Sequence, residues 1–276
     1  MNKILITFFA LLLSFLLVAK NSIENKLTPE HVYVNGTKVS IIPPAGFVSA
    51  NNFQGFAQSE SNSSIMIVEI PSGFSIISKG INKESLLQSG VNTEKIDTLT
   101  FNNLPAILIT GTQSADGRDF SKYILIFGTD KETILINGVF PKNYIRSGEE
   151  IKKSMLTTYY NAEQTIDVFN ILDYTLNVDS SKLKFAKFFS NSLIYNVDGQ
   201  FPTMSEDKTS LIVSKSISKI TTEDKEQFAV YRLGQMPYEI KNISSKNPIS
   251  INQFSGFEIT AEGVNKSSQE VEHLYQ

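Results

Sequence analysis

The sequence predicts an α+β protein built from two tandem α/β/α sandwich domains with antiparallel sheets, the second of them incomplete at its C-terminus. Three observations support this prediction. The chain matches itself at an offset of about 145 to 150 residues, its strands are apolar on both alternating faces, and amphipathic helices accompany those strands. We therefore expect each sheet to be buried between helices.

The internal match defines the expected domains. At an offset of 145 residues, 51–68 falls on 196–213, and at an offset of 150 residues, 102–105 falls on 252–255. The domain boundaries that follow from this match are a first domain at 31–160, a linker at 161–171 and a second, related domain at 172–276. Carried forward at the same offset, the second copy would continue beyond the last residue, so we expect it to lack its final strand and its covering helix.

The first copy is expected to contain six strands and a short helix between the second and the third. Pro43 ends the first strand because proline cannot donate to a ladder, and Asp116-Gly117 marks a hairpin turn. Asn82 is the expected N-cap of the short helix, which Gly90 ends. The expected strands are 38–42, 64–70, 96–101, 104–112, 119–127 and 133–140.

A second helix is expected to close the first copy. Ser147 and Glu150 form a capping box, and Ile151, Met155 and Tyr159 recur every four residues. A single apolar stripe of this kind predicts a helix that covers a sheet.

The second copy is expected to repeat this order. Thr221 or Thr222 is the expected N-cap of a helix that ends at Gly234. The extended stretches 249–254 and 257–261 match the first two strands of the long meander in the first copy.

The strands themselves favour the sandwich. The segments 107–109 and 123–127 lack the polar alternation of a sheet that faces water on one side. Both faces of the sheet are therefore expected to be covered, and helices on both faces give an α/β/α sandwich.

The first copy resembles the PsbP-like domain family. The resemblance is based on four features: the strand Val39-Ser40-Ile41-Ile42 followed by Pro44-Ala45-Gly46-Phe47, the strand 65–70, the meander and the closing helix. The resemblance covers roughly 31–160 and part of 172–276. It implies an α/β/α fold and a role in binding or assembly, and it transfers no catalytic residue.

The N-terminus has the layout of a secretory signal peptide. Lys3 provides a positive charge, 4–19 is apolar except for Thr7 and Ser14, and Lys20 ends the run. We predict that 1–20 is a signal peptide and that the protein is exported to the periplasm, the cell envelope or the medium, with a retained anchor or a buried helix as alternatives. After cleavage, no lasting membrane span is expected.

Composition excludes several classes of function. The chain has no cysteine, which excludes disulfides, thiolate metal sites and a cysteine nucleophile. A formal net charge of −3 does not favour nucleic acid as a partner. No glycine-rich phosphate loop is present. We therefore expect no cofactor.

The titratable residues suggest no reaction. His31 and His273 have no second histidine at ligand spacing, so a metal site is not expected. The densest carboxylates are expected in a hairpin turn or at helix N-termini rather than across a cleft; they are Asp116/Asp119, Glu149/Glu150 and Glu223/Asp224/Glu226. We predict no catalytic residue.

Phe53, Phe56 and Phe74 lie in two glycine-containing loops beside strand ends. They are either a surface that binds a partner, such as another envelope protein, or plugs in the core. Our leading hypothesis is a non-enzymatic envelope or periplasmic factor that acts through protein contacts. The alternative is a small-molecule-binding protein or hydrolase whose site is assembled from sequence-distant residues, which a pocket with convergent carboxylates would favour.

Overall fold

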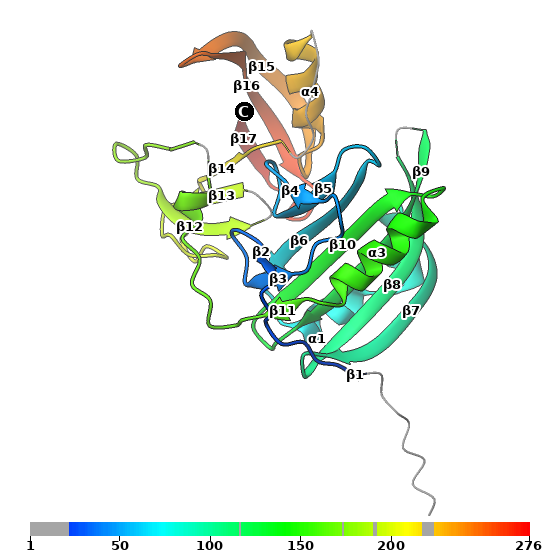
Figure 1. Ribbon diagram of the computed structural model, residues 1–276. Helices are drawn as coiled ribbons and strands as arrows, with labels where there is room; N and C mark the ends of the chain where they lie inside the picture. Colours follow the sequence, from blue (N-terminus) through cyan, green and yellow to red (C-terminus); the bar gives the residue numbers. More distant parts are fainter. Residues whose placement is uncertain (1–21, 116, 173, 190–191, 217–223) are drawn as a thin grey trace, which may run out of the picture. The chain divides into compact units, whose positions relative to one another are not determined.

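The computed structural model describes residues 22–115, 117–172, 174–189, 192–216 and 224–276 (Figure 1). The predicted signal peptide therefore lies outside the described residues. Contacts between backbone positions divide the chain into two compact units, Met1–Ile217 and Ser218–Gln276. The predicted boundaries at 160 and 172 stay predictions. No helix in the described parts of the chain is long and apolar enough to cross a bilayer.

An eight-stranded sheet forms the centre of the first unit. Its strand order is β1-β7-β8-β9-β10-β6-β5-β4. All neighbours are antiparallel except β1 and β7. The strands are β1 (Ser22–Ile23), β4 (Val48–Ser49), β5 (Gly55–Gln58), β6 (Ser63–Ile70), β7 (Asn92–Phe101), β8 (Leu104–Ala115), β9 (Arg118–Gly128) and β10 (Thr133–Pro141).

The meander of this sheet lies where the sequence predicts it. β7 and β8 are joined by Asn102 and Asn103, whose φ angles of 49° and 62° suit the tight hairpin turn. Gly117, with a φ of 70°, turns the chain between β8 and β9. Its predicted partner in that turn, Asp116, lies outside the described residues. Each turn residue is one that tolerates the left-handed region.

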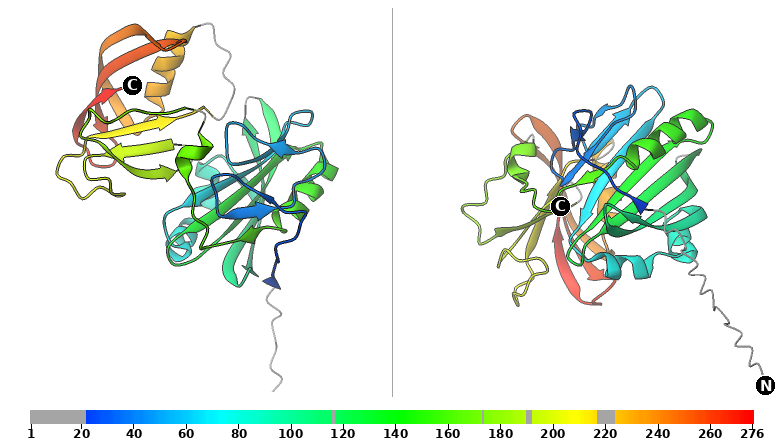
Figure 2. Two further views of the ribbon diagram at one scale, coloured as in Figure 1. Left: turned by 60° about the vertical axis from the view of Figure 1, so that its left-hand side comes forward. Right: turned by 60° about the horizontal axis from the view of Figure 1, so that its bottom comes forward.

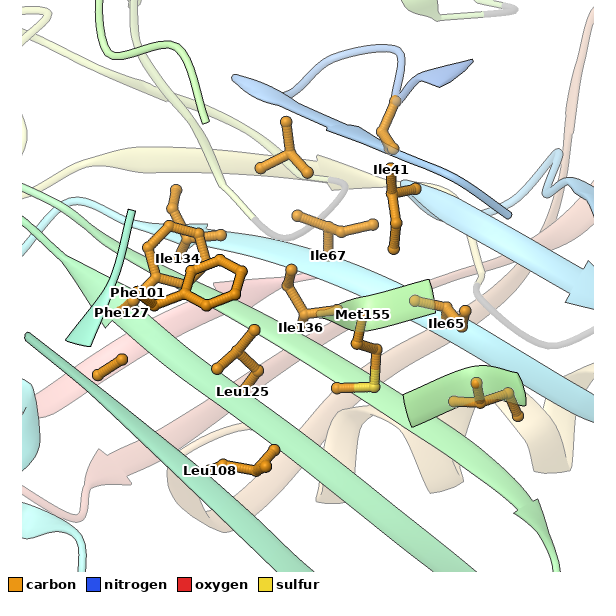
Figure 3. Close-up of a cluster of buried hydrophobic side chains, with 14 of the residues drawn as sticks. Ile41, Ile65, Ile67, Phe101, Leu108, Leu125, Phe127, Ile134, Ile136 and Met155 are labelled. Atoms are coloured by element: carbon orange, nitrogen blue, oxygen red, sulfur yellow. The ribbon is translucent and has the colours of Figure 1, made fainter. Parts of the chain in front are cut away.

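One face of the sheet carries the larger core, which α3 (Ile145–Met155) covers. Ile151 and Met155 are fully buried in that core. Figure 3 shows its aliphatic and aromatic side chains, and Phe101 and Phe127 lie with ring centroids 5.0 Å apart. Beside α3 the same face meets a small sheet of order β11-β3-β2, made of β2 (Val32–Tyr33), β3 (Val39–Ile41) and β11 (Tyr159–Tyr160).

The predicted capping box of this helix is wrong. Ser147 and Glu150 lie inside α3, which starts at Ile145 with Tyr144 as an N-cap that makes no side-chain bond. Packing explains the earlier start: a Cβ on Gly148 would lie 2.4 Å from the ring of Phe140, so the first turn already rests on the core. Tertiary contact here outweighs the local capping signal.

The opposite face of the sheet carries a second core under short helices, α1 (Phe74–Ile77), η1 (Ser78–Gly80) and α2 (Lys83–Gln88). In Figure 2, right, the green α3 and the cyan α1 and α2 lie on opposite sides of the sheet. Asn82 caps α2 as predicted, in a capping box with Ser85.

The predicted α/β/α sandwich is nevertheless wrong. The described residues form four sheets and only four α-helices, two of which span four and six residues. The molecule is therefore mainly β. The periodicity of a strand indicates that a face of the sheet is buried, but it does not indicate which element covers that face. In this protein one face is covered by a single long helix and a small sheet. The other face is covered by short helices.

A third sheet completes the first unit, in the order β12-β13-β14. The strands are β12 (Lys184–Phe189), β13 (Ser192–Asn196) and β14 (Ser210–Ser214), preceded by η2 (Val168–Ile171). Leu193 and Tyr195 of the central strand are buried. β12 is an edge strand, and a bulge interrupts its register with β13 between Phe185 and Lys187.

The second unit is a helix packed on a three-stranded antiparallel sheet. The elements are α4 (Lys225–Gly234), β15 (Tyr238–Ile251), β16 (Phe254–Asn265) and β17 (Val271–Tyr275). Leu233 and Ile259 lie at the centre of its core. The order helix, strand, strand, strand also occurs in α2, β7, β8 and β9, and the turn residue Asn252 has a φ of 54°. That the two units are related copies stays a prediction.

The helix α4 ends at Gly234 as predicted, but its N-cap differs. Asp224 is the N-cap, and its side chain accepts a hydrogen bond of 2.8 Å from the backbone N–H of Gln227. The predicted caps Thr221 and Thr222 lie outside the described residues. A carboxylate at this position also interacts favourably with the helix dipole.

Candidate functional site

The first unit contains a cleft of about 390 Å³. One wall is the end of β6 with the turns that precede β3 and β10; the other is β12 with the stretch that precedes it. The residues that line the cleft are Gly36, Thr37, Lys38, Gln54, Ile67, Val68, Glu69, Glu132, Gln164, Ile166, Val168, Phe185, Ala186, Lys187, Phe188 and Phe189. The cleft is thus assembled from segments far apart in the sequence.

Two carboxylates lie side by side on the first wall. Glu69 follows Ile65 and Ile67 at a spacing of two, so it points to the same face of β6 as these core residues. It pairs across the sheet with Ile134. Glu132 precedes Ile134 by two residues on that same face and is therefore the diagonal neighbour of Glu69. The two carboxylates close the polar end of the core.

Lys38 contacts both carboxylates. Its Nζ lies 2.8 Å from Oε1 and 2.9 Å from Oε2 of Glu132, and its backbone N–H donates to Oε1 of Glu69. The side chains of Lys38 and Glu132 are 22% and 21% exposed. This ion pair is therefore less screened than a surface pair.

A tight turn and a tyrosine hold this cluster in position. Thr37 is buried in the turn, where its hydroxyl donates to the carbonyl of Val34 at 2.8 Å. Tyr160 donates its phenolic hydrogen to Oε1 of Glu132. Burial, and then the hydrogen bond to Glu132, raise the pKa of Tyr160 well above its usual value. The phenol therefore remains a donor throughout the physiological pH range.

Glu69 is the carboxyl group of the cleft with the unusual protonation behaviour. Burial raises its pKa above the usual value, and the neighbouring charge of Glu132 raises it further. The N–H of Lys38 and the positive charges of Lys38 and Lys187 act in the opposite direction and do not cancel the effect. A cation placed beside Glu69 would therefore stabilise its charged form.

The second wall is mainly apolar. Phe185, Phe188 and Phe189 line it together with Ile166 and Val168. Its one cation, Lys187, is half-buried and forms no ion pair within the described residues. The arrangement can therefore bind a ligand that has both apolar and charged groups.

The phenylalanines predicted as a partner-binding loop lie elsewhere. Phe56 is buried in the larger core and Phe74 in the core beneath the short helices, while Phe53 is half-buried. None of the three lines the cleft. Their placement fits the core-packing alternative for Phe56 and Phe74; partner binding by the loop stays a prediction.

The two histidines lie outside the cleft as well. His31 has its Nδ1 2.9 Å from the hydroxyl oxygen of Thr28 and its Nε2 2.8 Å from the carbonyl oxygen of Thr157, so it joins the N-terminal segment to the end of α3. His273 is exposed on β17. Within the described ranges, no group of three histidine or carboxylate side chains is arranged to hold a metal ion.

Four charged residues of the cleft were not predicted from the sequence: Lys38, Glu69, Glu132 and Lys187. A signal for Glu69 was present, because a charged residue occupies the inward position of an otherwise apolar strand, two residues after Ile67. Lys38 lies in a turn, Glu132 lies just before β10 and Lys187 lies on the edge strand β12. No spacing connects them in the sequence.

Comparisons with known proteins identify no family. No family model matches the chain, and no curated protein matches it. A solved structure from Bacteroides thetaiotaomicron matches at 15% identity with a TM-score of 0.35, and half of each chain is covered. The present chain thus spans half the length of that protein.

Two further structures match at a similar level. PA94 from Pseudomonas aeruginosa, a protein of unknown function, matches at 12% identity with a TM-score of 0.35, covering 46% of this chain and 85% of its own. LpqN of Mycobacterium tuberculosis, involved in cell envelope biogenesis, matches at 11% identity with a TM-score of 0.32, covering 44% and 81%. At such scores we infer neither fold nor function from them, and the resemblance to PsbP-like domains stays a prediction.

Proposed function

We propose that this chain is an exported, non-enzymatic binding protein that takes its ligand in the cleft of the first unit. The observation that supports this function is the convergence of Glu69 and Glu132 in one cavity with Lys187, which forms no ion pair among the described residues. A cavity of about 390 Å³ lies in the range of ligand-binding pockets. Export follows from the signal-like segment 1–20.

The chemistry of the walls defines the ligand. The aromatic and aliphatic wall removes apolar groups of the ligand from water, while Lys187 and the carboxylate of Glu69 provide oppositely charged contacts. A ligand with an apolar body and at least one charged group fits both. An ion alone would leave the phenylalanine wall without a partner.

The hydrolase alternative is less well supported by this geometry. A general acid and a base or nucleophile have to flank the scissile bond, but Glu69 and Glu132 are neighbours on one sheet face. Both oxygens of Glu132 already accept bonds from Lys38. The wall of β12 contributes no carboxylate to the lining of the cleft.

Titration of the full chain with 1-anilinonaphthalene-8-sulfonate tests the cleft, since this dye combines an apolar body with one anionic group. We expect saturable fluorescence enhancement that is lost in Ala186→Trp, which fills the cleft. The matched control is Ile212→Trp on β14 of the same sheet, where the side chain is exposed and outside the cleft; it should retain saturable binding.

Equal enhancement in wild type and Ala186→Trp would contradict a ligand-binding cleft. Export is tested separately by fractionating cells that express the chain with and without residues 1–20. Recovery of both forms in the cytoplasm would contradict the proposed location and leave the cleft untouched as a binding site.

A further inference from the structure

We propose that the ligand of this cleft is an extended peptide segment of a partner protein, which pairs as an added strand with the free edge of β12 and places a basic side chain beside Glu69. This inference rests on the proposed function and specifies its ligand. It combines the backbone of β12 with the side chains of the opposite wall.

The first support is the way in which β12 lines the cavity. Successive side chains of a strand point to opposite faces, so a strand seen from one face contributes every second residue to a surface. Here five consecutive residues, 185–189, all line the cleft. The strand therefore presents its edge to the cavity.

The second support is that this edge is unused. β12 is the terminal strand of its sheet, and its ladder partner is β13 alone. Within the described part of the chain, no backbone bond outside that ladder involves 184–189. Every second residue of an edge strand directs its N–H and C=O away from the ladder. Such an edge is the site at which an extended peptide adds to a sheet.

The third support is size. Six residues of strand span roughly 20 Å, and the bulge between Phe185 and Lys187 bends the strand at its middle. A peptide of four to six residues would match that length. Its alternate side chains would meet Val68 on one side and Phe188 on the other, both of which line the cavity.

Charge complementarity specifies the side chain. Of the two carboxylates that line the cleft, Glu132 is paired with Lys38, whereas Glu69 accepts, within the described residues, a backbone N–H and no side-chain donor. A lysine or arginine of the peptide would complete its hydrogen bonding and offset the nearby charge of Glu132. Lys187 lies on the opposite wall and would receive an acidic group or the peptide C-terminus.

The experiment is a selection of displayed random heptapeptides on the immobilised full chain, followed by affinity measurement with the selected peptides. We expect alternating apolar and polar residues with lysine or arginine at one recurring position. Binding should weaken about tenfold or more in Glu69→Gln. The matched control is Glu60→Gln, an exposed carboxylate outside the cleft, and it should bind as wild type does.

A backbone readout separates strand addition from simple occupancy. Bound peptide should slow amide hydrogen exchange in 184–189, and N-methylation of alternate peptide residues should weaken binding about tenfold in one of the two registers, since one register loses its donors to the ladder. Acid-rich peptides whose affinity depends on Lys187 and not on Glu69 would overturn the assignment of a basic side chain.

Other outcomes would overturn the peptide inference, and they can be distinguished from failure of the proposed function. A lysine and a bulge on an edge strand can also prevent the addition of another strand. If they do so in β12, no selected peptide would slow amide hydrogen exchange in 184–189. If the dye then still bound in a manner abolished by Ala186→Trp, the cleft would remain a small-ligand site and the peptide inference would be wrong. If both tests failed, the proposed function would fail with it.

Discussion

The ammonium of Lys38 lies within 2.9 Å of both oxygens of Glu132, while the backbone N–H of the same lysine donates to Glu69. One residue of a turn therefore fixes two carboxylates that come from β6 and from the start of β10. All three residues line the cleft.

Replacing Lys38 by methionine should lower the free energy of unfolding by about 1 to 3 kcal/mol, because a half-buried carboxylate then loses its cation. Urea denaturation of the full chain measures the change. The matched control is Lys95→Met, whose partner Asp97 is more exposed; it should cost about 0.5 kcal/mol or less. Equal costs for the two variants would show that the Lys38 pair is an ordinary surface contact.

Glu69 should make stability fall as pH rises. Because its pKa is raised in the folded state, Glu69 binds more protons in the folded protein than in the unfolded chain between about pH 4.5 and its folded-state pKa, and its contribution to the free energy of unfolding decreases through that window. Carboxylates with lowered pKa, such as Asp198 and Glu239, act in the opposite direction. The informative quantity is therefore the difference between two variants.

Glu69→Gln removes the titration and keeps an oxygen that can accept from Lys38. Urea denaturation of wild type and Glu69→Gln between pH 4 and pH 8 should give a difference that grows in favour of the variant as pH rises. A difference independent of pH would mean that the carboxyl group titrates normally in the folded protein.

Asn102 should contribute more to stability than its neighbour in the same turn. Its side chain accepts from the N–H of Asn25 at 2.8 Å and donates to the carbonyl of Thr158 at 2.8 Å. Asn102→Gly keeps the positive φ and removes both bonds, which should cost about 1 to 3 kcal/mol. Thermal unfolding measures it.

Asn103→Gly is the control, since that side chain is exposed and makes one long contact, 3.4 Å to Glu24. It should change stability by about 0.5 kcal/mol or less. A larger cost at Asn103 than at Asn102 would contradict the structural role of the half-buried Asn102 amide.

Gly138 should tolerate no side chain. A Cβ there would lie 2.5 Å from Cγ2 of Ile151 and 2.7 Å from Sδ of Met155, so α3 would have to move off β10. We expect Gly138→Ala to cost about 1 to 3 kcal/mol in urea denaturation. Gly80→Ala, where no atom lies within 4 Å of the added group, should be close to neutral. If Gly138→Ala were as stable as wild type, the packing of α3 would be looser than the structure indicates.

Local chemistry predicted much of the first unit. The turn signal at Gly117 marked the β8–β9 hairpin, and Asn82 and Gly90 marked the ends of the α2 region. These signals act between residues close in sequence, so they are readable there. The covering layers were predicted wrongly because an apolar strand face can be buried by a helix or by a small sheet such as β11-β3-β2.

The cleft could not be predicted because its charged residues meet only through the fold. Lys38 and Glu132 are 94 positions apart, and Lys187 stands on another sheet. Glu69 alone was recognisable in the sequence, as the charged residue of an inward-facing series. Phe56 and Phe74 were weighed as surface anchors because aromatic residues beside glycines suit a loop, but strand pairing and helix packing bury them.

The attachment of the N-terminal segment has a consequence for the order of events during synthesis. Asn25 bonds to the carbonyls of Leu156 and Thr158, and His31 lies against that of Thr157. The segment cannot dock until these residues have left the ribosome, which adds about 5 to 20 residues per second. The nascent amino-terminal segment therefore stays undocked while more than a hundred residues are still being made.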